Sequence, residues 1–294
     1  MKILLLGRNG QVGWELARLF SESNHTLLSY NSSELNLTDL QQLKSEVCRQ
    51  QPEIIINAAA YTAVDKAEEE QEASFAINAL APKVLAELAG KMNIPLIHIS
   101  TDYVFDGLKT GCYLEDDAVG PKSEYGYSKL AGEQFIVNAL PQHIIIRTSW
   151  VFGYHGNNFV KTMLNLANKP ELSIVEDQKG SPTYSEDIAK LIIRLVNCFI
   201  MKGTLDWGIY HYTGDEQTTW FDFAAVIFKK AQEHHLIANS PNLLPIPTSQ
   251  YPTPAKRPFN SCLSLDKIAK YGDLDNSWRD GLDRMLIQLK NDDI

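Results

Sequence analysis

The feature that most constrains how this chain can fold is a glycine-rich turn placed directly after its first apolar run. Residues 3–6 predict a buried strand, residues 7–13 contain the spacing G-x-x-G-x-x-G, and residues 11–20 have the apolar periodicity of an amphipathic helix. The first glycine permits a tight turn, the second lets the backbone approach a ligand, and the third lets the helix pack closely on the strand. Strand, turn and helix in this order predict a dinucleotide-binding fold.

The predicted helix begins where the phosphate groups of such a ligand would bind. Its first N–H groups have no partners within the helix and carry a partial positive charge, which favours an anionic diphosphate. An ordinary glycine turn is the alternative, because the glycine spacing alone has low specificity. We predict that a nicotinamide dinucleotide is held through Gly7, Arg8, Gly10, Gln11, Val12 and Gly13.

The first half of the chain alternates short β-rich runs with helical patterns. Apolar strands that alternate with helices predict parallel strands covered on both faces. The fold class is therefore α/β, with a Rossmann-like, doubly wound parallel sheet. Further strands are predicted at residues 26–29, 53–56, 96–99 and 143–146, and helices at residues 73–92 and 125–139.

Turn residues become more frequent after residue 150. We predict a dinucleotide-binding domain over residues 1–150 and a smaller substrate-binding lobe over residues 151–294. The two halves have no flexible linker between them, so we expect the lobe to be interleaved with the first domain. Its helices are predicted at residues 187–200, 221–231 and 278–289.

Charge, apolar segments and cysteines exclude several classes of protein. The net charge of −9 argues against sequence-independent binding of nucleic acid, which requires a basic surface. No apolar stretch approaches the roughly 18 residues of a membrane span, and no signal peptide is recognisable, so we expect no membrane association and a cytoplasmic location. The four cysteines have no C-x-x-C spacing, so neither a disulfide nor a zinc site is expected.

The adenine end of the predicted dinucleotide site has no obvious selectivity residue. NAD binders commonly place Asp or Glu at the end of the second strand, whereas residues 29–33 read Ser-Tyr-Asn-Ser-Ser and Glu34 comes late. No carboxylate would then repel a 2′-phosphate, and Arg8 could pair with one. We therefore expect NADPH, or the use of both NADPH and NADH; a solvated Arg8 is the alternative.

Tyr125 and Lys129 form a Tyr-x-x-x-Lys pair at the start of a predicted helix. The two side chains are one turn apart and share a face, and a neighbouring ammonium would lower the pKa of the phenol. Tyr125 would then exchange a proton with an alcohol or ketone oxygen near neutral pH. Such pairs are frequent by chance, so this one has weight only through its position after the strand at residues 96–99.

Small and polar residues follow two of the predicted strands, at the carboxyl ends where open α/β sheets bind ligands. Residues 100–102 read Ser-Thr-Asp, and a hydroxyl there could hold a substrate oxygen beside Tyr125; a Ser/Thr turn is the alternative. Residues 57–60 read Asn-Ala-Ala-Ala, which leaves room for a flat ligand or simply packs a helix on the sheet.

Longer stretches resemble the extended short-chain dehydrogenase/reductase superfamily and, within it, the family of the dTDP-4-dehydrorhamnose reductases. The Val-Asp-Lys-Ala-Glu run at residues 64–68 and the Tyr-Pro-Thr-Pro-Ala run at residues 251–255 are much more specific than a glycine turn. In the family's order, the similar stretches are residues 10–13, 57–68, 100–107, 125–133, 147–151, 156–159 and 251–258.

The resemblance implies an oxidoreductase that transfers a hydride from NADPH or NADH to C4 of dTDP-4-dehydro-β-L-rhamnose, the last step of dTDP-L-rhamnose synthesis. It implies that Tyr125 protonates the forming alkoxide, that Lys129 tunes Tyr125 and holds the nicotinamide ribose, and that Thr101 assists them. Besides the glycine turn, Tyr125 and Lys129, the expected cofactor contacts are Asn36, Leu37, Ala58, Ala59, Ala60, Tyr61 and Ile99.

On the substrate side the resemblance implies contacts from Thr101 and Asp102, with Trp150 flanking the sugar. Core packing is the alternative for Trp150. Asn158 and Arg257 are inferred partners of the nucleotide diphosphate, because a guanidinium fork fits phosphate oxygens. A product that donates rhamnose would be used in the assembly of cell-envelope polysaccharides, including the O-antigen of lipopolysaccharide.

The chain departs from the family at two of these positions. Asn36 replaces an Asp, which keeps a hydrogen-bonding shape but loses the charge, and Tyr61 stands where the family often has His. Glu15 and Glu186 could meet Mg²⁺ at the contact of a homodimer, and two solvated helix glutamates are the interpretation that we prefer. We therefore predict no required metal.

Rival functions share this fold, which also hosts epimerases, dehydratases and other nucleotide-ketosugar reductases. A dehydratase is disfavoured because Tyr103, and not a glutamate, follows Asp102. A non-catalytic dinucleotide-binding protein, similar to the regulatory subunit of methionine adenosyltransferase, is the alternative from a different class. The intact pair of Tyr125 and Lys129 favours an enzyme.

Overall fold

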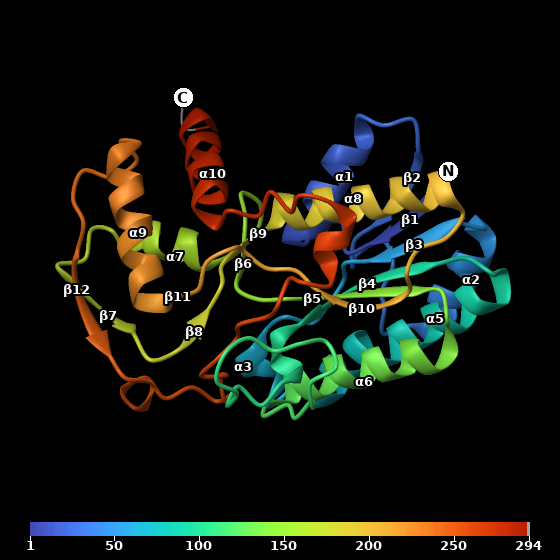
Figure 1. Ribbon diagram of the computed structural model, residues 1–294, viewed down its shortest axis with the longest axis horizontal. Coiled ribbons are helices and arrows are strands. Elements are labelled where there is room, and N and C mark those ends of the chain that lie inside the picture. Colours follow the sequence, from blue (N-terminus) through green and yellow to red (C-terminus); the bar gives the residue numbers. More distant parts are fainter. Residues whose placement is uncertain (293–294) are drawn as a thin grey trace.

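A six-stranded parallel sheet lies at the centre of the computed structural model, which describes residues 1–292 (Figure 1). Its strand order is β10-β5-β4-β3-β1-β2, so the direction of winding reverses between β1 and β3. The predicted Rossmann-like, doubly wound sheet is thereby confirmed. The strands are β1 (Lys2–Leu6), β2 (Thr26–Tyr30), β3 (Ile54–Asn57), β4 (Leu96–Thr101), β5 (His143–Thr148) and β10 (Gly208–His211).

Helices cover both faces of this sheet (Figure 1). On one face lie α1 (Gln11–Ser21) and α8 (Ser185–Lys202), and on the other lie α2 (Leu40–Gln50), α5 (Ala81–Met92) and α6 (Glu124–Ala139). Side chains of β1 alternate between the two layers: Ile3 and Leu5 pack toward the first face, and Leu4 and Leu6 toward the second. Burial on both faces explains why the strands are continuous apolar runs.

The helix expected over residues 73–92 is divided into three parts. It consists of α4 (Gln71–Phe75), one turn of π-helix at Ala76–Leu80, and α5. The π turn carries Asn78, whose side chain accepts a hydrogen bond from the backbone N–H of Tyr61 at 2.9 Å. It also brings the Asn78 carbonyl so close to α6 that a Cβ at Gly132 would lie 2.1 Å from it.

One helix that covers the sheet, α2, and one strand of the sheet, β10, were not predicted. Helix α2 is mostly polar, and it begins after Asp39, whose carboxylate accepts hydrogen bonds from the N–H groups of Gln41 and Gln42. Strand β10 extends the sheet beyond β5 and pairs with it in parallel. A short sequence such as Gly-Ile-Tyr-His has little pattern of its own, so its place in the sheet comes from that pairing.

Most of the remaining elements form a lobe beside the sheet (Figure 1). Its core contains Phe152, Phe223 and Trp278, all of them buried. Within residues 151–292 the chain returns to the sheet through α8 and β10, as an interleaved lobe requires. The division at residue 150 remains a proposal. Residues 293–294 of the expected lobe lie outside the described residues. The elements of this lobe are β6 (Val151–Phe152), α7 (Phe159–Asn165), β7 (Glu171–Val175), β8 (Lys179–Gly180), β9 (Thr183–Tyr184), β11 (Thr218–Thr219), α9 (Trp220–Glu233), β12 (Asn242–Ile246) and α10 (Trp278–Asp292).

The expectation that the cysteines form no disulfide is wrong. Cys112 and Cys262 are joined, with their Cα atoms 4.5 Å apart, while Cys48 and Cys198 are free. Tyr113 and Leu263, the next residue in each segment, form a β-bridge that brings the two segments together. A pairing across 150 residues depends on the fold, and cysteine spacing alone carries no information about it.

None of the helices in the described part of the chain is both long enough and apolar enough to cross a membrane.

Replacing Gly132 by alanine should destabilise the protein, because the new methyl group would meet the Asn78 carbonyl at 2.1 Å. We expect the free energy of unfolding in urea to fall by about 1–3 kcal/mol, the usual cost of overpacking. Gly90→Ala is the matched control, since a methyl group there meets Ala139 only at an ordinary 3.4 Å. Equal effects of the two substitutions would contradict this account of the π turn.

Candidate active site

A cleft of about 730 Å³ opens at the carboxyl ends of the strands, where the winding of the sheet reverses. This is the position at which open α/β sheets bind ligands. Of the residues predicted to bind a cofactor or substrate or to catalyse the reaction, the cleft is lined by Gly7, Gly10, Gln11, Val12, Asn36, Leu37, Ala58, Ala59, Ala60, Ile99, Thr101, Asp102, Tyr125, Lys129 and Trp150.

The glycine turn has no room for larger side chains. Gly7 has a φ of +87°, and a Cβ on it would lie 2.6 Å from the backbone nitrogen of Ala59. A Cβ on Gly13 would lie 2.0 Å from the carbonyl oxygen of Gly7. The backbone of the turn is therefore open toward the cleft, and α1 starts directly at its wall, as the binding of a diphosphate requires.

A carboxylate lies close to Arg8 in the structure, although the order of residues along the chain did not indicate it. Glu34 Oε1 accepts a hydrogen bond from Arg8 at 2.8 Å, and its Oε2 accepts one from the N–H of Asn31 at 3.0 Å. The expectation that no carboxylate stands near this corner is therefore wrong. The turn after β2 folds back and brings Glu34 to Arg8, although Glu34 comes late in the sequence.

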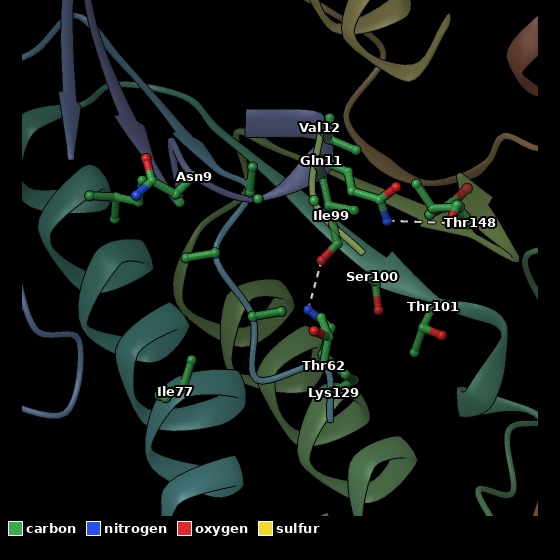
Figure 2. Close-up of a pocket in the computed structure, with 18 of the residues that line it drawn as sticks. Asn9, Gln11, Val12, Thr62, Ile77, Ile99, Ser100, Thr101, Lys129 and Thr148 are labelled. Atoms are coloured by element: carbon green, nitrogen blue, oxygen red, sulfur yellow. Dashed lines mark hydrogen bonds between the residues drawn. The ribbon is translucent and has the colours of Figure 1, made fainter. Parts of the chain in front are cut away.

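The expected reacting groups converge in the cleft. Thr101 ends β4, and its hydroxyl donates to Asp102 Oδ1 at 3.0 Å. Tyr125 lies in the first turn of α6, which begins after Ser123, whose side chain caps the helix. Figure 2 shows Lys129 reaching up from α6 toward the end of β4, where its Nζ donates to the carbonyl oxygen of Ile99 at 2.7 Å.

Burial, and not the neighbouring lysine, dominates the proton affinity of Tyr125. It raises the pKa of the phenol, and a hydrogen bond with Thr101 opposes this only in part. The expected lowering of the Tyr125 pKa by Lys129 is therefore wrong for the structure without ligands. Burial also lowers the pKa of Lys129 to about 8 and raises the pKa of Asp102 to about 6.

The two most specific sequence stretches meet each other in space. Asp65, in α3 (Val64–Ala67), accepts a hydrogen bond from the N–H of Ala255 at 3.2 Å and another from Arg257 Nη2 at 2.7 Å. Arg257 also donates to the Tyr103 hydroxyl at 3.2 Å. Residues 251–258, called the strap below, are thereby attached beside the cleft.

Trp150 lies both at the cleft and in a packing contact, and its contact with the sugar remains a prediction. It lines the cleft, and it also stacks on Trp220 with a ring separation of 3.6 Å and an angle of 12°. Its backbone is left-handed, with a φ of +49°. Gly180 leaves the space for the ring, because a Cβ there would lie 2.5 Å from the indole.

Some predicted residues lie outside the lining of the cleft. The Tyr61 hydroxyl donates to Glu70 at 2.7 Å. Asn158 caps α7 and donates to Gln11 at 3.0 Å, so it holds the lobe against the glycine turn. Arg8, Gly13 and Arg257 also lie outside the lining, and the ligand contacts proposed for all of the predicted residues remain predictions.

Several lining residues were missed by the sequence reasoning. Most of them lie within the glycine turn or within the stretches that resemble the family, but the sequence did not single them out individually as ligand contacts; residues 6, 30–32, 35 and 77 lie outside those stretches. Those that were not expected are Leu6, Asn9, Tyr30, Asn31, Ser32, Leu35, Thr62, Val64, Ile77, Ser100, Tyr103, Thr148, Ser149, Val151, Gly156 and Asn157.

Glu15 and Glu186 are not the solvated pair that we expected. Glu15 is only 1% exposed, and Arg18 donates to Glu15 at 2.8 Å and to Glu186 at 2.9 Å. The Arg18 guanidinium thus binds both of the carboxylates that were considered for Mg²⁺, and Arg284 lies 3.5 Å from Glu186 as a second cation. Among residues 1–292, no group of three or more His, Cys, Asp or Glu side chains is placed to hold a metal ion.

Comparison with known proteins assigns this architecture to one family. The sequence model of the RmlD substrate binding domain matches residues 1–291. The dTDP-4-dehydrorhamnose reductase of Aggregatibacter actinomycetemcomitans is 44% identical over 284 residues, which are 96% of this chain and 97% of the relative.

Solved structures agree with this comparison. A dTDP-4-dehydrorhamnose reductase from Clostridium acetobutylicum is 35% identical, with a TM-score of 0.90, and the match covers 99% of this chain and 100% of the other. The enzyme of that name from Bacillus anthracis, solved in complex with NADP, is 36% identical, with a TM-score of 0.87 and coverages of 98% and 99%.

The contact between Asp65 and the strap should be measurable as a coupling energy. In a double-mutant cycle of Asp65→Asn and Arg257→Gln, we expect a coupling of about 1 kcal/mol in urea unfolding, because both side chains are partly shielded from water. The exposed pair of Lys229 and Glu233, 4.0 Å apart, is the control and should give almost none. No coupling between Asp65 and Arg257 would show that the strap is held by other contacts.

Proposed function

The chain belongs to the RmlD substrate binding domain family, and from this premise we propose that it reduces the C4 ketone of dTDP-4-dehydro-β-L-rhamnose to give dTDP-β-L-rhamnose. One observation carries the proposal: Thr101, Tyr125 and Lys129 converge in a cleft that also contains the glycine turn. The names of the most similar relatives support the choice of substrate. The proposed step is the last one in the synthesis of a rhamnose donor for cell-envelope polysaccharides.

The residues of the cleft fit a nicotinamide dinucleotide. The backbone of Gly7 and Gly10 and the start of α1 would hold the diphosphate, in a cradle that a Cβ at position 7 would disrupt. Ala58, Ala59 and Ala60 leave space for the flat rings, and Lys129 is within the cleft to bind a ribose hydroxyl. When bound, the reduced nicotinamide supplies the hydride for the ketone carbon.

Tyr125 acts as the general acid in this proposal. Because burial raises the pKa of its phenol, Tyr125 keeps its proton at neutral pH and can donate it to the oxygen of a reduced ketone. The Thr101 hydroxyl lies next to Tyr125, and because its own proton is donated to Asp102, it can accept a hydrogen bond from the product hydroxyl once that has formed. Asp102 holds the Thr101 hydroxyl by a hydrogen bond of 3.0 Å, and Ser261 donates in turn to the other carboxylate oxygen of Asp102.

The preference for NADPH over NADH would depend on Arg8. In the structure Glu34 pairs with Arg8, so a 2′-phosphate has to compete with this carboxylate for the guanidinium. Such a competition favours the use of both cofactors. The NADP complex of the Bacillus anthracis relative supports the view that a 2′-phosphate can be accommodated in this family.

Other expectations remain proposals. We infer that the enzyme needs no metal, because Arg18 already binds both Glu15 and Glu186. A homodimer and a cytoplasmic location stay predictions from the sequence.

Tyr125→Phe tests the proposed acid. We expect kcat for the oxidation of NADPH by dTDP-4-dehydrorhamnose to fall by about 10²-fold or more, because the proton donor is lost. Binding of NADPH, measured by calorimetry, should persist. Tyr127→Phe is the control, since Tyr127 lies on the same helix but is 55% exposed.

Unchanged turnover in Tyr125→Phe would refute the assignment of Tyr125 as the general acid. The absence of any turnover in the unaltered protein, together with copurification of a tight partner, would favour the non-catalytic alternative.

Substitutions of Glu34 and Arg8 test the cofactor preference. Glu34→Gln should tighten NADPH by about tenfold and leave NADH nearly unchanged, because Arg8 is released from its partner. Arg8→Gln should weaken NADPH by a similar factor. Arg49→Gln, at an exposed arginine paired with Glu46, is the control. Equal effects on NADPH and NADH would rule out a contact between Arg8 and the 2′-phosphate.

A further inference from the structure

A row of three buried polar side chains runs beneath the floor of the cleft. Asn57 Nδ2 lies 3.1 Å from Nδ1 of His98, and His98 Nε2 lies 3.2 Å from Nζ of Lys129. Asn57 and His98 are fully buried, and Lys129 is 1% exposed. No motif in the sequence singled out His98, so its place in this row comes from the fold.

The pairing of β3 with β4 builds the row. Asn57 and His98 are opposite each other in the parallel register, so their side chains leave the sheet on the same face. That face is covered by α5 and α6, and Lys129 reaches His98 from α6.

Hydrogen-bond directions assign the proton of the imidazole. The N–H of Ala59 donates to Asn57 at 3.2 Å, and because an N–H can only donate, the atom that it meets is the amide oxygen. The amide NH₂ of Asn57 therefore faces His98, and Nδ1 of His98 must accept. A neutral imidazole has one proton, which consequently lies on Nε2 and points at Lys129.

Lys129 can satisfy this donor only with a lone pair on Nζ. An amine has two N–H groups and one lone pair: it can donate to Ile99 and accept from His98. An ammonium has no lone pair, so its N–H would face the N–H of His98. We propose that His98, oriented by Asn57, is a positioning residue that shifts Lys129 from the ammonium toward the amine form while the cleft contains no ligand.

The charged groups around Lys129 are compatible with this assignment. Glu133, one turn further along α6, would favour an ammonium, but Arg147 of β5 binds that carboxylate at 2.7 Å and compensates its charge. From the end of β4, Asp102 is directed to Thr101 and Ser261. Tyr125, on the same helix, is neutral when protonated. Burial also lowers the pKa values of both Lys129 and His98.

An amine at Lys129 would matter for the reduction, and this step rests on the proposed function. When Tyr125 gives its proton to the substrate oxygen, it becomes an anion. The amine can then take up one proton from solvent, so the net charge of Tyr125 and Lys129 together stays at zero before and after the transfer. An ammonium present from the start would leave this buried pair charged in the resting enzyme.

The decisive measurement is nuclear magnetic resonance of the full-length, ligand-free protein labelled with ¹⁵N in histidine and lysine. We expect His98 to be protonated on Nε2 and not on Nδ1, and Lys129 to titrate near pH 8, well below the exposed lysines. The His98 signals are assigned by their loss in His98→Asn. A proton on Nδ1, or a Lys129 titration together with the exposed lysines, would overturn the proposal.

Two variants separate this role from a merely structural one. In His98→Asn, which removes the donor at Nε2, we expect Lys129 to titrate about one pH unit higher, and the pH profile of kcat to shift with it while KM changes little. In Asn57→Asp the carboxylate should move the imidazole proton to Nδ1, which the same spectra report. His143→Asn, at another buried histidine, is the control and should leave the Lys129 titration unchanged.

If a variant does not fold, the spectra of the unaltered protein still decide the question. Expected proton positions without any reduction of the dTDP-sugar would contradict the proposed function and leave the assignment of Lys129 intact.

Discussion

The close approach of β1 and α1 is the constraint on which the rest of the structure depends. A side chain at position 13 would collide with the carbonyl oxygen of Gly7, and a side chain at position 7 would collide with the start of the loop after β3. Because neither residue has one, the helix N-terminus, the glycine turn and the ends of β1 and β3 meet at one point. The cleft opens at this point because the winding of the sheet reverses there.

Burial then determines the proton states of the groups that enter the cleft. It raises the pKa of Tyr125 and that of Asp102, and it lowers the pKa of Lys129. Burial thus shifts each group toward its neutral form, and for Tyr125 that form is the protonated phenol that the proposed reduction needs. The hydrogen bonds from Asn57 through His98 to Lys129 follow the same tendency, because they are all satisfied only when the lysine is an amine.

Contacts between distant segments complete the site on the side of the lobe. Asp65 binds the strap through both Ala255 and Arg257, so the two most specific stretches of the sequence form one structural unit. Asn158 connects α7 to Gln11 of the glycine turn. Trp150 stacks on Trp220 at the cleft, and the absence of a side chain at Gly180 leaves the space that its indole occupies. The lobe and the sheet thus share the walls of one cleft.

The sequence by itself determined the central strands, most of the helices, the glycine turn and the candidates for the reacting groups, because these depend on local periodicity and on short motifs. It did not determine the place of β10, the π turn at Asn78, the contact of Glu34 with Arg8 or the joining of Cys112 to Cys262. Each of these features depends on a contact between segments that are distant in the sequence, and no local motif or periodicity indicates which segments will meet. The direction of the pKa shift of Tyr125 also required the tertiary structure, since the spacing to Lys129 indicates a neighbour but only the packed fold shows how completely the phenol is removed from water.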